Sequence, residues 1–228
     1  MTDDEQNQFG RAMGSLTEDC MHKAGYGSWS SAPDLPKVGP KTLTDLRYGI
    51  HDAVLVGKRG YHPDAAEKAA HDAAVEAAVA GGTRGAAAVA ESDCGQKSKQ
   101  QIGDAQSGFQ LAEQLANDAF TKAKQEPEVV AAFAQWSACM KESGYKYREP
   151  LDAVDDRKFS RDVTKAEIDT ALADLNCRSR SNVALVWYQA EVRLQKDAAE
   201  RNAQALHTAR TRLDATLKNV SVVLAGKR

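Results

Sequence analysis

Four cysteines are the residues of this chain whose chemistry is best defined by number and spacing. Cys20, Cys94, Cys139 and Cys177 lie tens of residues apart, and no Cys-x-x-Cys pair occurs among them. This spacing argues against zinc, whereas an even number of widely spaced cysteines is typical of disulfides in an exported protein. The repeat described below favours the pairs Cys20–Cys94 and Cys139–Cys177. Four buried thiols in a cytosolic protein are the alternative.

Three histidines gather in one stretch of the chain with acidic residues. His51, His62 and His71 lie near several carboxylates, and Asp64, Glu67 and His71 share one face of a predicted helix. Such a group could bind a divalent metal or respond to pH. A solvated helix face explains the same pattern and is the interpretation we favour. The sequence therefore predicts no metal site and no cofactor.

Four aromatic residues are the candidate ligand-binding residues. They directly follow two helices that end at glycine, and they are Tyr26, Trp29, Tyr145 and Tyr147. Tyrosine and tryptophan suit a site that is apolar on one side and wet on the other. Packing against the disulfides is the default interpretation, and a ligand groove lined by these side chains is the alternative.

Catalytic motifs are missing from the sequence. No Gly-x-Ser-x-Gly, His-Glu-x-x-His, Walker loop or Gly-x-Gly-x-x-Gly occurs. Pairs of carboxylates carry no weight, because 32 acidic residues guarantee some by chance. We predict no catalytic residues and a protein that is not an enzyme.

The composition favours closely packed helices. Hydrophobic residues make up 42% of the chain and charged residues 27%, which excludes disorder and a membrane-embedded protein. A net charge of −2 leaves no basic excess for nucleic acid. Alanine is abundant, aromatic residues are only 6%, and no stretch alternates apolar and polar side chains as a strand would. We predict an all-α fold.

One motif occurs twice. The segment Cys20-Met21-x-x-x-Gly25-Tyr26 has the same spacing as residues 139–145, where cysteine, methionine, glycine and tyrosine recur. In each copy the glycine fits the left-handed residue of a Schellman cap, in which the methionine and the tyrosine meet. The chain therefore consists of two diverged helical repeats, each with one disulfide.

The repeats define the expected domain boundaries. We predict a flexible tail at residues 1–8 and a first repeat at residues 9–125, with an insertion at about residues 43–85. The second repeat covers residues 126–228 and ends in a long helix.

That helix is predicted from an apolar pattern that runs unbroken from the Thr164–Glu167 capping pair to Leu224. It would contain up to ~60 residues and measure ~90 Å. Residues 97–125 are its natural partner in a long antiparallel helical hairpin, but they are about half as long. We therefore expect either a homodimer through residues 200–224 or a break that folds the helix end back onto the body.

At the repeated motif the chain resembles a group of uncharacterised actinobacterial secreted proteins and lipoproteins of unknown function. Members carry a Trp-x-x-Cys-Met-x-x-x-Gly-Tyr element, as at residues 136–145, together with a Tyr-Gly and a Gly-Tyr element, as at Tyr48-Gly49 and Gly60-Tyr61. The first copy departs from the pattern, because Leu16 stands near the tryptophan position. The resemblance covers most of residues 9–180. It implies export, often with a lipid anchor, and no activity.

Together these features predict an extracytoplasmic, cell-surface binding or adaptor protein for a protein or peptide partner. The polar first twenty residues are not a signal peptide, so we expect that a signal segment was removed, together with any lipid anchor that would attach the protein to a membrane. An immunity or sequestering lipoprotein for an amphiphilic peptide antibiotic is one alternative. A cell-wall hydrolase is another, and a cleft with two or more buried, pKa-shifted acids would favour it.

Overall fold

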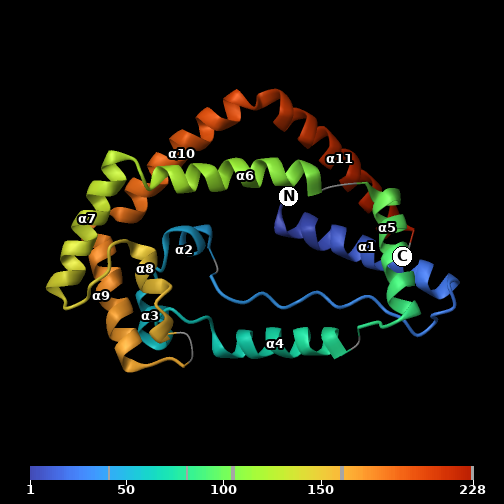
Figure 1. The fold of residues 1–228 in the computed structure, drawn as a ribbon, viewed down its shortest axis with the longest axis horizontal. Coiled ribbons are helices and arrows are strands. Elements are labelled where there is room, and N and C mark those ends of the chain that lie inside the picture. The colour runs from blue at the N-terminus through green and yellow to red at the C-terminus, as the bar shows by residue number, and fades with distance from the viewer. Residues whose placement is uncertain (41, 81, 104–105, 160–161, 227–228) are drawn as a thin grey trace. The chain divides into compact units, whose positions relative to one another are not determined.

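The computed structural model describes residues 1–40, 42–80, 82–103, 106–159 and 162–226. These residues form eleven α-helices, one short 3-10 helix and no strand, which confirms the all-α prediction (Figure 1). The helices are α1 (Asp3–Lys23), α2 (Leu43–Tyr48), α3 (Ala53–Arg59), α4 (Ala65–Ala80), α5 (Ala86–Ile102), α6 (Gln106–Ala123), α7 (Pro127–Glu142), α8 (Pro150–Val154), η1 (Arg157–Phe159), α9 (Lys165–Ser181), α10 (Val183–Arg201) and α11 (Ala203–Ala225).

The chain divides into two compact units, neither of which is continuous in sequence. Unit 1 contains residues 1–36, 72–115 and 199–228, and unit 2 contains residues 37–71 and 116–198. The predicted repeats at 9–125 and 126–228 follow other boundaries, and the duplication itself stays a prediction. About two thirds of the predicted insertion, up to His71, belongs to unit 2.

The two predicted Schellman caps have the same geometry. Tyr26 N–H donates to Met21 O over 3.0 Å, and Tyr145 N–H donates to Met140 O over 2.9 Å. Both capping glycines have a positive φ, 93° in the first copy and 89° in the second. The side chains of Met21 and Met140 are fully buried, so each cap closes over apolar surface as expected.

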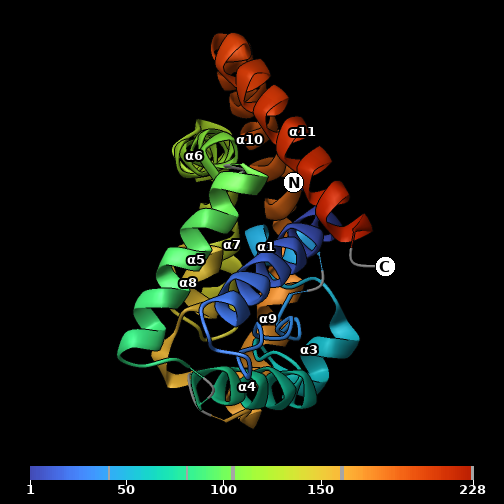
Figure 2. The ribbon, with the colours of Figure 1, turned by 90° about the vertical axis from the view of Figure 1, so that its right-hand side faces the viewer.

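Unit 1 is built on α1, which contacts both α5 and α11 (Figure 2). The Cys20–Cys94 disulfide joins α1 to α5, and the buried hydroxyls of Thr17 and Ser98 lie 3.1 Å apart between the same helices. The core residues are Ala12, Ile102 and Val220. The predicted tail at residues 1–8 is wrong, because α1 already begins at residue 3 with a capping box from Thr2.

Unit 2 surrounds two buried tryptophans, Trp136 of α7 and Trp187 of α10. The Cys139–Cys177 disulfide joins α7 to α9. Figure 1 shows α3, α7 and α8 beside α9, which contacts all three. Both predicted disulfide pairs are therefore confirmed.

The single helix expected from residue 165 to residue 224 is wrong. It is interrupted at Asn182, which adopts the left-handed conformation with φ 53°, and again at Asn202. Asparagine tolerates left-handed backbone at low cost, and apolar periodicity alone does not detect such a break. Helix α11 packs on α1 and α5, which corresponds to the fold-back alternative. The homodimer stays a prediction.

An antiparallel hairpin is present within unit 2, but it is shorter than the one predicted. Phe120 of α6 stacks on Trp187 of α10 with ring centroids 4.7 Å apart. One helix turn earlier on α6, Ala116 O accepts a bond from Arg47, which also binds Glu191, one turn later on α10. The two helices therefore run in opposite directions along this stretch.

Helix α9 buries the face that its sequence marks as polar. Its buried residues are Glu167, Thr170, Ala171, Asp174, Cys177, Arg178 and Ser181. Leu172, which belongs to the predicted apolar stripe, is 40% exposed. Burying carboxylates and a guanidinium is costly unless each is paired and hydrogen-bonded, so this face requires specific partners.

Candidate functional site

The partners of the buried charges come largely from residues 47–62, within the predicted insertion. Glu191 of α10 is 1% exposed. It accepts bonds from Arg47 Nε over 2.6 Å and from the Tyr48 hydroxyl over 2.7 Å. The Arg47 guanidinium also lies 4.6 Å above the Phe120 ring. The end of α2 is thereby fixed to α10 by charge-assisted bonds.

Asp174 is the centre of the network and is fully buried. Its Oδ1 accepts from Trp136 Nε1 over 2.9 Å and from Arg178 Nε over 2.7 Å, and its Oδ2 accepts from the Tyr61 hydroxyl over 3.2 Å. Burial raises the pKa of Asp174, and the Arg178 charge opposes that shift. Arg178 also donates to the carbonyls of Tyr48 and Pro150, so it joins α9 to the end of α2 and to the start of α8.

Glu167 connects the network to the segment after α3. Its Oε1 accepts from Tyr61 N–H and lies 2.8 Å from His62 Nδ1. Gly60, with φ 57°, packs so closely that a Cβ there would lie 2.6 Å from the same oxygen. Only glycine fits this position, because both the backbone angle and the space exclude a side chain.

A cavity of about 270 Å³ is formed by residues 38–63, the segment that the network holds. Its apolar wall consists of Val38, Pro40, Ile50, Leu55, Val56, Tyr61 and Pro63. Its polar lining consists of the side chains of Thr42, Asp45, His51, Asp52, Arg59 and His62. An apolar cavity with a few convergent polar groups is the usual form of a small-molecule site.

Two of the polar groups in this cavity are histidines oriented by carboxylates. His51 Nδ1 lies 2.6 Å from Asp45 Oδ1, and His62 Nδ1 lies 2.8 Å from Glu167 Oε1. A carboxylate at Nδ1 fixes the orientation of the ring and favours a proton on that nitrogen. The cavity wall is therefore ordered by its own hydrogen bonds.

The four predicted ligand residues are divided between the two units. Tyr26 and Trp29 lie after α1 in unit 1, and Tyr145 and Tyr147 lie after α7 in unit 2. Tyr145 packs against the core of unit 2. The Tyr147 hydroxyl donates to Asp156 over 2.8 Å. The second pair therefore fits the packing interpretation, and a ligand role for it stays a prediction.

Trp29 lines a cavity of about 340 Å³ in unit 1, together with several serines, Thr83 and Glu91. Its carbonyl lies 2.8 Å from His22 Nε2, which holds the loop to α1. Thr83 already donates its hydroxyl to Glu91. The cavity offers one aromatic side chain and few other apolar groups, so it is a weaker candidate than residues 38–63.

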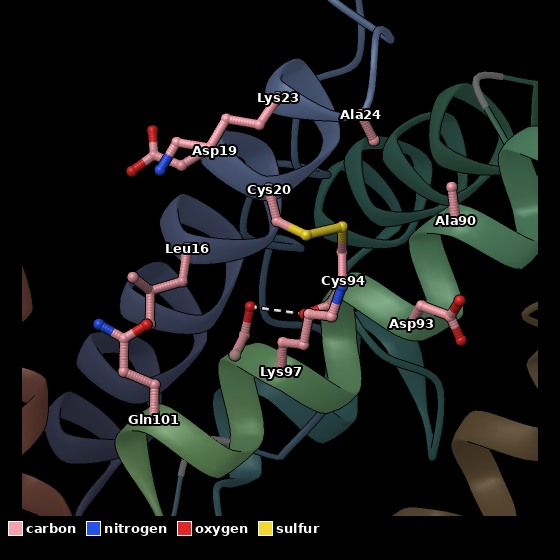
Figure 3. Close-up of a pocket in the computed structure, with 11 residues that line it drawn as sticks. Leu16, Asp19, Cys20, Lys23, Ala24, Ala90, Asp93, Cys94, Lys97 and Gln101 are labelled. Atoms are coloured by element: carbon pink, nitrogen blue, oxygen red, sulfur yellow. Dashed lines mark hydrogen bonds between the residues drawn. A yellow bond between two sulfur atoms is a disulfide. The ribbon is translucent and has the colours of Figure 1, made fainter.

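Two open grooves are also present on the surface of the protein. One, of about 630 Å³, lies beside the Cys20–Cys94 disulfide. In Figure 3 the side chains of Asp19, Lys23 and Asp93 extend away from that disulfide, so its charged groups do not converge. The other, of about 670 Å³, runs along α7 past Phe133.

The buried acids bear directly on the hydrolase alternative. Glu167, Asp174 and Glu191 are buried, but none of them lines any of these four hollows. The partners recorded for Asp174 and Glu191 are side chains of the protein itself, and the hydrolase alternative stays a prediction. In the part of the chain that the structure describes, no group of three or more potential ligands could hold a metal ion.

The residues that organise this site were not predicted from the sequence. Glu167 was predicted in a capping pair, and the Thr164 hydroxyl does accept the Glu167 N–H. The Glu167 side chain, however, turns inward to residues 61 and 62. Two sequence features pointed here. One is the Tyr-Gly and Gly-Tyr pair at residues 48–49 and 60–61, whose four residues all contact the network. The other is the histidine group, of which His51 and His62 line the cavity.

Comparisons with known proteins do not identify the site, so it is interpreted from its geometry. No protein-family model, curated protein or solved structure matches this chain. The two disulfides indicate an oxidising, extracytoplasmic environment. None of the described helices is both long enough and apolar enough to cross a membrane.

Proposed function

We propose that the protein is an extracytoplasmic, non-enzymatic binding protein whose ligand site is the cavity at residues 38–63. The observation that carries this proposal is the convergence of apolar and polar side chains on one small cavity. Binding rather than conversion is proposed because the carboxylates beside the two histidines, Asp45 and Glu167, orient the histidine rings within the protein.

The buried network supports the proposal by fixing the cavity wall before a ligand arrives. Arg47, Tyr48, Tyr61 and His62 are each bonded to a buried carboxylate of α9 or α10. A site that is already ordered loses less conformational entropy on binding. Charges buried at such cost are consistent with a segment whose position matters for function.

The size of the cavity defines the ligand that it can hold. A volume of about 270 Å³ equals that of roughly nine water molecules at about 30 Å³ each. That space suits a small molecule of six or seven carbon atoms, or one apolar side chain of a peptide at the cell envelope. A peptide partner is therefore compatible with the proposal. A lipid anchor is compatible with it as well, since the cavity does not depend on one.

Nuclear magnetic resonance with hexan-1-ol as the probe tests the site. We expect amide shifts at residues 38–63 and a Kd on the order of 1 mM, because about 0.8 kcal/mol per buried methylene is largely offset by lost motion. Leu55→Asp should abolish binding, and this side chain is 37% exposed, so the fold should tolerate the change. Leu46→Asp is the matched control, since Leu46 is 67% exposed and does not line the cavity. Binding that survives Leu55→Asp would contradict the proposal.

A further inference from the structure

Arg59 stands out among the charged groups that line the cavity. It occupies the last position of α3 and is half-buried. No described carboxylate forms an ion pair with it, whereas Arg47 and Arg178 each bind a buried acid. A guanidinium against apolar walls, without a protein counter-ion, is a natural partner for an anion.

The carboxylates in the same wall are already engaged. Asp45 uses one oxygen to accept from the Thr42 hydroxyl over 2.8 Å and the other to hold His51 over 2.6 Å. Asp52 caps α3, where its Oδ1 accepts the N–H groups of Val54 and Leu55. Asp52 is also exposed, so water and salt screen its charge.

We infer that the ligand of this cavity is an amphiphile with a short apolar body and a single carboxylate, which binds Arg59. This inference rests on the function proposed above and adds the chemistry of the head group. The planar guanidinium can donate two parallel bonds to a carboxylate, which matches one cation with one negative charge. The apolar body lies against Ile50, Leu55 and Val56.

A cationic ligand is disfavoured by the same arrangement. An ammonium group would approach the like charge of Arg59, and each oxygen of Asp45 already has a partner, Thr42 or His51. A neutral alcohol would bury its chain equally well but would leave Arg59 without a counter-ion. The head group therefore determines the order of affinity, with carboxylate first, alcohol second and ammonium last.

A head-group series tests this order directly. Dissociation constants for hexanoate, hexan-1-ol and hexylammonium are measured by chemical-shift titration on the intact, oxidised protein at neutral pH and low salt. We expect hexanoate to bind about tenfold more tightly than hexan-1-ol, since a charge-assisted bond exceeds a neutral one. Arg59→Gln should remove this preference, so that hexanoate and hexan-1-ol bind the variant with similar dissociation constants.

Lys58→Gln is the matched control. Lys58 precedes Arg59 on α3, is exposed and does not line the cavity, and its replacement removes the same charge. The inference is overturned if hexanoate binds no better than hexan-1-ol, if hexylammonium binds best, or if Lys58→Gln removes the preference as fully as Arg59→Gln. If hexan-1-ol binds at residues 38–63 in any of these cases, the proposed site stands without the head group. If no probe binds there, the proposed function fails as well.

Discussion

Replacing Asp174 with asparagine perturbs the network at its centre with almost no change in volume. The substitution removes the negative charge that compensates Arg178, whose side chain is 5% exposed. It also replaces one carboxylate oxygen with an amide donor, which then faces the Tyr61 hydroxyl if the amide oxygen keeps the position that accepts from Trp136 and Arg178. Removing one partner of a buried ion pair typically costs about 3–5 kcal/mol. Because the amide oxygen of asparagine can still accept from Trp136 and Arg178, we expect the lower end of this range, about 3 kcal/mol, for Asp174→Asn.

Asp169→Asn is the matched control on the same helix. Asp169 also pairs with a cation four residues away, Lys165, but the two side chains are 47% and 87% exposed. An exposed pair of this kind contributes less than about 1 kcal/mol. The two substitutions therefore change the same functional group in the same helix and differ mainly in burial.

Urea unfolding, followed by circular dichroism and tryptophan fluorescence, measures the difference. Two of the three tryptophans, Trp136 and Trp187, lie in unit 2, so fluorescence reports chiefly on that unit. If Asp174→Asn and Asp169→Asn have equal effects, the buried charge does not hold unit 2 together and our reasoning about the cavity wall is refuted.

Three further predictions concern unit 1, the buried tyrosines and the disulfides. Val220→Asp should lower stability by about 2–4 kcal/mol in thermal melts, whereas Val222→Asp should change little, because Val220 is fully buried and Val222 is 66% exposed. Burial and the nearby Asp174 charge raise the pKa of Tyr61. Tyr61 ionises at a lower pH in the unfolded protein than in the folded protein, so its contribution to the free energy of unfolding is intact below pH ~10 and falls above it. Tyr61→Phe should reduce that fall in unfolding curves recorded at alkaline pH. Thiol titration of the unfolded, unreduced protein should find no free thiol, and reduction should remove about 4 kcal/mol per disulfide; two reactive thiols would contradict the compartment.

The sequence predicted those features of the fold that depend on local chemistry. A Schellman cap needs one glycine and two apolar neighbours, so the motifs at Gly25 and Gly144 could be identified from spacing alone. The disulfide pairs followed from the same repeat. The helix start at Thr164 could be predicted because a capping side chain bonds within three residues.

Features that depend on distant partners could not be predicted in this way. Glu191 lies 143 residues from Tyr48 and Asp174 lies 113 residues from Tyr61, and charges at these positions look like a solvated helix face. The break at Asn182 depends on the left-handed conformation of a single residue. Asparagine tolerates this conformation but does not require it. The cavity was missed because residues 38–63 acquire a fixed shape only through these distant bonds.

The most direct test of the proposed site is an isotope-filtered NOE experiment on the oxidised protein with unlabelled hexanoate. It detects protons of the ligand within about 5 Å of protons of the protein, and so reports contact rather than an indirect shift. We predict NOEs from the hexanoate chain to the methyl groups of Leu55 and Val56, which line the cavity. NOEs confined to Trp29 or Phe133, or none at saturating hexanoate, would contradict the assignment of the ligand site to residues 38–63.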